Sequence, residues 1–145
     1  MNISEPRATI TGEATLAILE GAMAKARELE RKIAVAVVDS AGELVGFVAA
    51  AGVARISHAV ARDKAYTSAM TGMPSIEWKA YMDWIPVHER EIILRHEGYI
   101  GADGGFPIRD GDLVVGGVGA SGANQEDDAE CARAGLAAAG ITVNP

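Results

Sequence analysis

Two pairs of short, apolar and β-branched runs constrain the fold of this chain most strongly, because only a few turn residues separate the members of each pair. The first pair is 33–39 and 44–48, and the second is 106–109 and 112–116. Runs this close in sequence form antiparallel hairpins, whereas consecutive parallel strands need a long crossover between them. The sequence therefore predicts an antiparallel sheet built from two hairpins.

Helical periodicity surrounds these hairpins. Apolar residues recur at three- and four-residue steps over 12–31 and 53–71, one or two further helices broken at Pro86 are expected within 75–97, and a last helix covers about 124–139. Because these helices come before, between and after the two hairpins along the chain, we expect them to cover both faces of a small sheet. We expect an α/β/α sandwich of the α+β class, with residues 1–11 as an N-terminal arm and 12–145 as a single domain.

The composition narrows the class of protein. The 145 residues include 20 acidic and 13 basic side chains, for a net charge of −7, so nucleic acid is not an expected partner. No apolar run reaches the roughly 18–20 residues of a membrane-spanning helix, and the N-terminus lacks the pattern of a signal peptide. The single cysteine, Cys131, suits the reducing cytoplasm, where we expect this protein. Small residues dominate and aromatic residues make up only 5%, so self-association into a homo-oligomer would add burial.

A glycine-rich run, Gly116 to Gly122, is expected to form a loop before the last helix, and it resembles a dinucleotide-binding fingerprint. The fingerprint requires a parallel βαβ unit and a later acidic residue, which this chain does not offer, so NAD is not expected. Two interpretations stay open. Backbone amides at the helix entrance could hold an anion, or the glycines could permit tight turns and close helix–sheet packing.

Lys64 lies on an apolar helical stripe together with Val53, Ile56, Val60 and Thr67. A lysine in that position either extends its ammonium to solvent from the edge of the stripe or stands in a cavity with a counter-ion or an anionic ligand. A desolvated lysine is also a candidate base or imine-former.

Acidic residues at two other places have both structural and functional interpretations. Asp39 ends the first strand, where it could start a turn or orient a ligand. Glu126, Asp127 and Asp128 follow Asn124, the expected N-cap of the last helix, and the helix dipole explains this run as a solvated helix start.

Two histidine–glutamate pairs, His88-Glu89 and His96-Glu97, lie eight residues apart, so both histidines would share a face of one continuous helix. They could bind a divalent metal, or one could ligate haem iron, or they could simply be surface residues.

Most of the tryptophans and tyrosines of this chain flank the segment that holds the two histidine–glutamate pairs. They are Trp78, Tyr81, Trp84 and Tyr99. Such rings suit a pocket for a planar ligand, a subunit interface, or ordinary core packing.

These stretches, in their order and spacing, resemble the GlcG/HbpS-like family, which includes the C-terminal domain of PduO-type proteins. The resemblance covers about residues 12–140. The matching stretches are Val35 to Asp39 with Gly42 and Leu44, Lys64 to Thr67, Gly104 to Ile108, Gly116 to Gly122, and Asp127 through the final helix. Two segments depart from the family pattern: 48–52 is uncharged, and 76–99 is longer and more polar.

The resemblance implies a profilin-like fold with a five-stranded antiparallel sheet, a homo-oligomer (dimer, tetramer or octamer), and haem or a related tetrapyrrole as ligand. It also implies a site near Lys64, Asp39 and the two glycine-rich stretches. The ligand-binding candidates within those stretches are Gly104, Gly105, Gly119 and Ser121.

Two functional hypotheses follow. In the first, a small-molecule-binding protein holds haem or a similar planar, carboxylated ligand, with His88 or His96 as the axial ligand and Lys64 pairing with a propionate. In the second, a cofactor-independent catabolic enzyme isomerises, hydrolyses or cleaves a small oxygenated, carboxylated compound. There His96 with Glu97, or Asp39, would move protons while Lys64 holds developing negative charge. In a metal-assisted variant, the ligands would be His88, Glu89 and His96.

Overall fold

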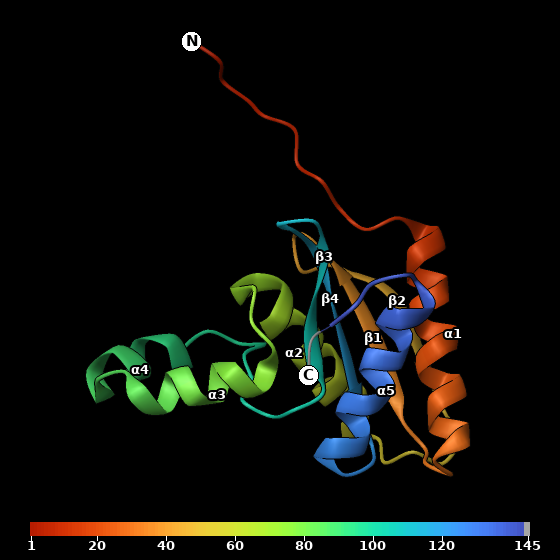
Figure 1. The fold of residues 1–145 in the computed structure, drawn as a ribbon. Helices are drawn as coiled ribbons and strands as arrows, with labels where there is room; N and C mark the ends of the chain where they lie inside the picture. The colour runs from red at the N-terminus through yellow and green to blue at the C-terminus, as the bar shows by residue number, and fades with distance from the viewer. Residues whose placement is uncertain (144–145) are drawn as a thin grey trace.

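A four-stranded antiparallel sheet organises the computed structural model of the chain, which describes residues 1–143 (Figure 1). The elements, in chain order, are α1 (Gly12–Glu28), β1 (Ala34–Asp39), β2 (Leu44–Ala49), α2 (Ile56–Thr71), α3 (Ser75–Trp84), α4 (Val87–Leu94), β3 (Gly105–Asp110), β4 (Leu113–Ser121) and α5 (Gln125–Ala138). The strand order is β2-β1-β4-β3, so each hairpin supplies one edge strand and one central strand. The antiparallel α/β/α sandwich is confirmed, but the fifth strand expected from the resemblance is absent from residues 1–143.

The sheet is covered by helices on both faces (Figure 1). Strand β1 alternates, so that Val35 and Val37 pack toward α1 and α5, whereas Ala34 and Ala36 pack toward α2. The α1–α5 side is filled by large side chains such as Ile18 and Leu136, and the α2 side mainly by alanines. Helix α2 therefore lies unusually close to the sheet.

The glycines of β4 make this close approach possible. A Cβ atom at Gly117 would lie 2.1 Å from the carbonyl oxygen of Ala65, and one at Gly119 would lie 2.1 Å from that of Ala61. These positions were expected to form a loop before the last helix, but they belong to the nine-residue strand β4. At both positions the glycines serve close helix–sheet packing, one of the two interpretations left open by the sequence.

Helices α3 and α4 project from the sandwich as a helical arm, here called the α3–α4 arm (residues 75–94) (Figure 1). The chain breaks between them at Pro86, as predicted. The arm has its own small core of Trp78, Met82 and Ile85. The guanidinium of Arg90 donates hydrogen bonds to the carbonyl oxygens of Met82, Asp83 and Ile85, which joins the end of α3 to α4.

Three smaller features complete the fold. Asn124 caps α5, as expected, with its side-chain oxygen 2.8 Å from the backbone nitrogen of Asp127. Pro107 lies in the edge strand β3, in keeping with its missing N–H. Among the described residues, no helix combines the length and the apolar character needed to cross a bilayer.

Candidate functional site

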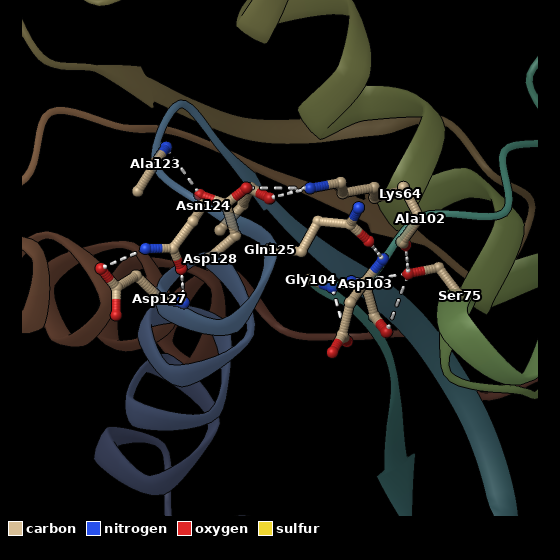
Figure 2. A network of polar contacts seen from close by, with 12 residues as sticks. Lys64, Ser75, Ala102, Asp103, Gly104, Ala123, Asn124, Gln125, Asp127 and Asp128 are labelled. Carbon is tan, nitrogen blue, oxygen red and sulfur yellow. Dashed lines mark hydrogen bonds and ion pairs between the residues drawn. The ribbon is translucent and has the colours of Figure 1, made fainter.

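Lys64 is buried where α2 meets the end of β4. Its residue is only 2% exposed, and its Nζ donates to the carbonyl oxygen of Ala120 at 2.8 Å and to Oδ2 of Asp128 at 3.1 Å (Figure 2). Asp128 is equally buried, and its Oδ1 accepts a hydrogen bond from the backbone N–H of Ala123 at 2.9 Å. The ammonium therefore does not reach solvent, and its counter-ion is a carboxylate of the same chain.

The surroundings of this pair are filled. A Cβ atom at Gly104, whose φ is +114°, would lie only 3.0 Å from Nζ of Lys64. None of the five prominent clefts of the described residues is lined by Lys64. A buried lysine needs a partner to stay charged, and this one has it within the fold. Lys64 and Asp128 thus join α2, β4 and α5 and present no free face to a ligand.

Asp128 is the partner that the sequence interpretation missed. Asp127 behaves as expected for a helix start, because it is paired with Arg31 at 2.7 Å near the surface. Asp128, in contrast, begins the buried stripe of α5 that continues through Ala132 and Leu136. An acid on the apolar stripe of one helix and a lysine on that of another is the signal that could have identified the pair.

The glycine-rich loop before β3 is also satisfied internally. The N–H of Gly104 donates to Oδ1 of Asp103 at 2.8 Å, and the N–H of Gly105 donates to Oγ of Ser75 at 2.8 Å (Figure 2). Ser75 itself donates to the carbonyl oxygen of Ala102. Gly119 lies inside β4 and Ser121, its last residue, is buried. The amides of Gly104 and Gly105, which could have held an anion, already have acceptors.

Asp39 lies far from Lys64. In the pairing of β1 with β4, Asp39 is opposite Gly116 whereas Ala34 is opposite Ser121, so Asp39 is at the other end of the sheet from the Lys64–Asp128 pair. Its Oδ1 accepts hydrogen bonds from the backbone N–H groups of Ala41 and Glu43, at 2.9 and 3.0 Å. This geometry is the turn-forming role of Asp39, and the structure does not bring it together with Lys64.

The histidine–glutamate pairs do not form a metal centre. Helix α4 ends at Leu94, so His96 and Glu97 lie beyond it and share no continuous helical face with His88. No group of three or more His, Cys, Asp or Glu side chains within residues 1–143 is placed to hold a metal ion. The expected set of His88, Glu89 and His96 is therefore not assembled in this chain.

His96 instead lines a cleft of about 230 Å³ between the α3–α4 arm and the segment that follows it. The segment after α4 brings Tyr99 beside Trp78, with 5.5 Å between the ring centroids, and His96 lines the same cleft. The cleft is lined by Trp78, Lys79, Met82, Asp83, Arg90, Ile93, Leu94, His96, Tyr99 and Gly101. Aromatic, apolar and cationic groups thus meet one histidine here, and this cleft is the candidate functional site.

The charged groups of the cleft differ in availability. The guanidinium of Arg90 is occupied by three carbonyl oxygens. Lys79 forms an ion pair with Asp83 at 2.6 Å, and both side chains are more than half exposed. The hydrogen bond from Lys79 lowers the pKa of the Asp83 carboxyl below its ordinary value. Lys79 is the lysine of this cleft that can exchange its partner in solvent.

The tyrosines and tryptophans of the chain form a continuous series through this cleft. Trp78 lies 5.5 Å from Tyr99 and 5.3 Å from Tyr81 between ring centroids, and Tyr81 lies 6.3 Å from Trp84. Tyr99 also meets Tyr66 of α2 edge-on at 5.4 Å. Burial raises the pKa of the Tyr99 hydroxyl, and Tyr66 adds to this shift. Of these rings, Trp78 and Tyr99 line the cleft, whereas Trp84, at the far end of the series from Tyr66, is 80% exposed.

The fold closely resembles those of several solved structures. The structure superposes on Klebsiella pneumoniae protein ORFY with a TM-score of 0.88 and 22% identity, over 99% of both chains. For a PduOC–haem complex, the TM-score is 0.81 and the identity 21%, over 90% of this chain and 95% of the other. A double mutant of HbpS from Streptomyces reticuli gives 0.84 and 25%, over 94% of this chain and 91% of the other.

These likenesses define a class of antiparallel α/β/α sandwiches, and the sequence identifies the family within it. The family model described as "Haem degrading protein HbpS-like" matches residues 10–137. The chain therefore belongs to the HbpS-like family, as the resemblance in its motifs indicated. No curated protein sequence matches the chain significantly.

Proposed function

We propose that this protein binds haem, or a similar planar and carboxylated molecule, at the cleft between the α3–α4 arm and the residues 96–101 that follow it. The observation that carries this proposal is the set of groups lining one cleft: the rings of Trp78 and Tyr99, the apolar side chains of Met82 and Ile93, and the imidazole of His96. Membership of the HbpS-like family and the fold of a PduOC–haem complex support it.

The lining residues fit the chemistry of haem. A porphyrin is flat and apolar over most of its surface, and aromatic rings with long aliphatic side chains are its usual contacts. Haem iron is commonly held by one histidine nitrogen, and His96 is exposed at the cleft. Lys79, whose partner Asp83 is exposed, supplies a cation for a propionate. Haem supplies a redox-active iron at such a site.

The small volume of the cleft limits how much of the ligand's surface it can cover. Pockets that enclose drug-sized molecules measure about 300–1,000 Å³, so a cleft of about 230 Å³ would cover only part of a haem. Binding at an open cleft depends more strongly on the iron–histidine bond than binding in a closed pocket does. His96 is therefore the residue whose removal has the largest effect on affinity.

Haem titration of the whole chain, followed in the Soret region, tests this assignment. We expect a saturable Soret shift with the wild-type chain and an affinity at least about tenfold lower for His96→Ala, which corresponds to about 1.4 kcal/mol. His88→Ala is the matched control, because His88 is exposed on α4 outside the cleft and its removal should leave affinity unchanged.

Two outcomes would contradict the assignment. Equal haem affinity of the wild-type chain and of His96→Ala would remove the proposed axial ligand. A larger loss in His88→Ala than in His96→Ala would place the iron outside the cleft.

Lys79→Met should weaken the binding of haem but not the binding of a haem diester that lacks free propionates, and this comparison isolates the role of the lysine.

A further inference from the structure

The segment that joins α4 to β3, here called the 97–103 segment, is held in place by side chains of other elements. Within residues 1–143, no backbone–backbone hydrogen bond ties it to a helix or strand. Yet Tyr99 and Gly101 of this segment line the cleft, and His96 directly precedes it. Backbone groups of a half-buried segment need partners. The side chains that supply them are Thr67 for Gly98 and Ile100, Ser75 for Ala102, and Gln125 for Asp103.

The hydroxyl of Thr67 contacts the 97–103 segment on both sides of Tyr99. It accepts a hydrogen bond from the backbone N–H of Ile100 at 2.9 Å and donates one to the carbonyl oxygen of Gly98 at 3.2 Å. One hydroxyl thus satisfies a backbone donor and a backbone acceptor, as a neighbouring strand would. Thr67 is fully buried on α2, which packs closely on the sheet, so it offers the segment a fixed point.

The position of Tyr99 depends on this attachment. Its ring centroid lies 5.4 Å from that of Tyr66 on α2 and 5.5 Å from that of Trp78 on α3. Gly98, whose φ is +93°, comes so near α2 that a Cβ atom there would lie 2.8 Å from the ring of Tyr66. The close approach of Gly98 to α2 therefore sets where Tyr99 lies against Trp78.

We propose that Thr67 is a positioning residue of the haem cleft, which holds the 97–103 segment so that Tyr99 and His96 line the same cleft as Trp78. The proposal rests on the haem-binding function proposed above. Thr67 acts through the segment and not on the ligand, because it is not among the residues that line the cleft and its hydroxyl already has a donor and an acceptor.

The effect of losing this hydroxyl follows from the two backbone groups that it satisfies. The N–H of Ile100 and the carbonyl of Gly98 would be left without partners, and the segment would move to reach water. Haem would then have to order the segment when it binds, and the cost of that ordering lowers the affinity.

Haem titration and amide hydrogen exchange of the whole chain test this role. Thr67→Val keeps the shape of the side chain but loses the hydroxyl. We expect its haem affinity to fall about tenfold and its Ile100 amide to exchange at least about tenfold faster. Thr67→Ser keeps the hydroxyl and should stay within about twofold of the wild-type chain in both measurements. This rescue separates positioning from packing, because serine restores the hydroxyl but not the methyl group.

Thr71→Val is the matched control for the same substitution on the same helix. The Thr71 hydroxyl bonds to the backbone of Thr67 and Met73 instead of the 97–103 segment. Both the haem affinity and the exchange of the Ile100 amide should therefore keep their wild-type values in this variant.

Three outcomes would overturn the proposal. They are wild-type haem affinity in Thr67→Val beside a normal loss in His96→Ala, an Ile100 amide that exchanges at the wild-type rate in Thr67→Val, and equal losses in Thr67→Val and Thr67→Ser. Failure of the haem-binding function looks different, because His96→Ala would then bind haem as tightly as the wild-type chain. If Thr67→Val folds poorly, Thr67→Ala removes the same hydroxyl and is compared with Thr67→Ser in its place.

Discussion

Two lysine–aspartate pairs, one in the sandwich and one on the α3–α4 arm, show how differently the two regions use the same chemistry. Lys64 and Asp128 lie 3.1 Å apart, and neither side chain is more than 3% exposed. Lys79 and Asp83 lie closer, at 2.6 Å, but both are more than half exposed. Burial rather than distance decides what a pair does, because solvent screens the exposed pair and cannot replace a lost partner in the buried one.

The comparison distinguishes polar groups that hold the fold together from polar groups that are open to a ligand. In the sandwich, the groups that sequence patterns singled out are satisfied by their own chain: Lys64 by Asp128, Gly105 by Ser75, and Asp39 by its turn. On the arm, His96 is exposed and Lys79 holds an exposed partner. The polar groups of the candidate cleft are therefore open to solvent, whereas those of the sandwich are held by partners within the fold.

The largest expected effect is on the buried pair. Lys64→Met leaves Asp128 buried without its cation, and we expect the free energy of unfolding to fall by about 3–5 kcal/mol. Lys64→Met/Asp128→Leu removes both charges and should recover most of that loss, since apolar replacements of buried pairs are often neutral or stabilising. Urea unfolding followed by circular dichroism measures both. A double variant as unstable as the single one would show that the pair is not the source of the effect.

A smaller effect concerns the buried thiol of the sandwich. The pKa of the Cys131 thiol is raised from 9.0 to about 11. Burial is the main cause, and the nearby carboxylates of Asp128, Asp127 and Glu130 add to the shift. Between about pH 9 and 11 the unfolded chain releases this proton while the folded chain keeps it, so the free energy of unfolding falls with rising pH, on the order of 1 kcal/mol. Below about pH 8 the thiol is protonated in both states and contributes almost no pH dependence. The difference in pH slope between the wild-type chain and Cys131→Ala isolates this group, and equal slopes would contradict it.

The smallest expected effect is on the exposed pair of the arm. Lys79→Met should leave the midpoint of urea unfolding unchanged, because a solvent-exposed ion pair contributes little to stability. The same variant should weaken haem binding a few-fold if Lys79 meets a propionate. A marked loss of stability in Lys79→Met would mean that the arm, too, depends on its charges for folding.

The sequence was informative where structure is local. Both hairpins, the break at Pro86 and the cap at Asn124 follow from neighbouring residues, and they were predicted correctly. The glycines between Gly116 and Gly122 were misinterpreted as a loop because glycine is a strong turn signal by itself. Their role in β4 depends on α2 packing against them, which neighbouring residues do not encode.

The candidate site was less accessible to sequence reasoning. The stripe that holds Lys64 was visible, but its partner Asp128 was assigned to a solvated helix start, because the helix dipole already explained an acidic first turn. The cleft at His96 depends on the chain turning back after α4 to bring Tyr99 beside Trp78. No periodicity in the sequence records that reversal, so His88 and His96 looked equivalent although only His96 lines the cleft.

The most direct test of the account compares the haem affinity of Lys64→Met/Asp128→Leu with that of His96→Ala. It asks whether the Lys64–Asp128 pair of the sandwich is purely structural and whether the ligand binds at the cleft beside the arm. We expect the double variant to bind haem with the wild-type affinity and the wild-type Soret maximum, while His96→Ala loses at least about tenfold. A folded double variant that no longer binds haem, beside a His96→Ala variant that binds normally, would place the site at Lys64 and contradict the account.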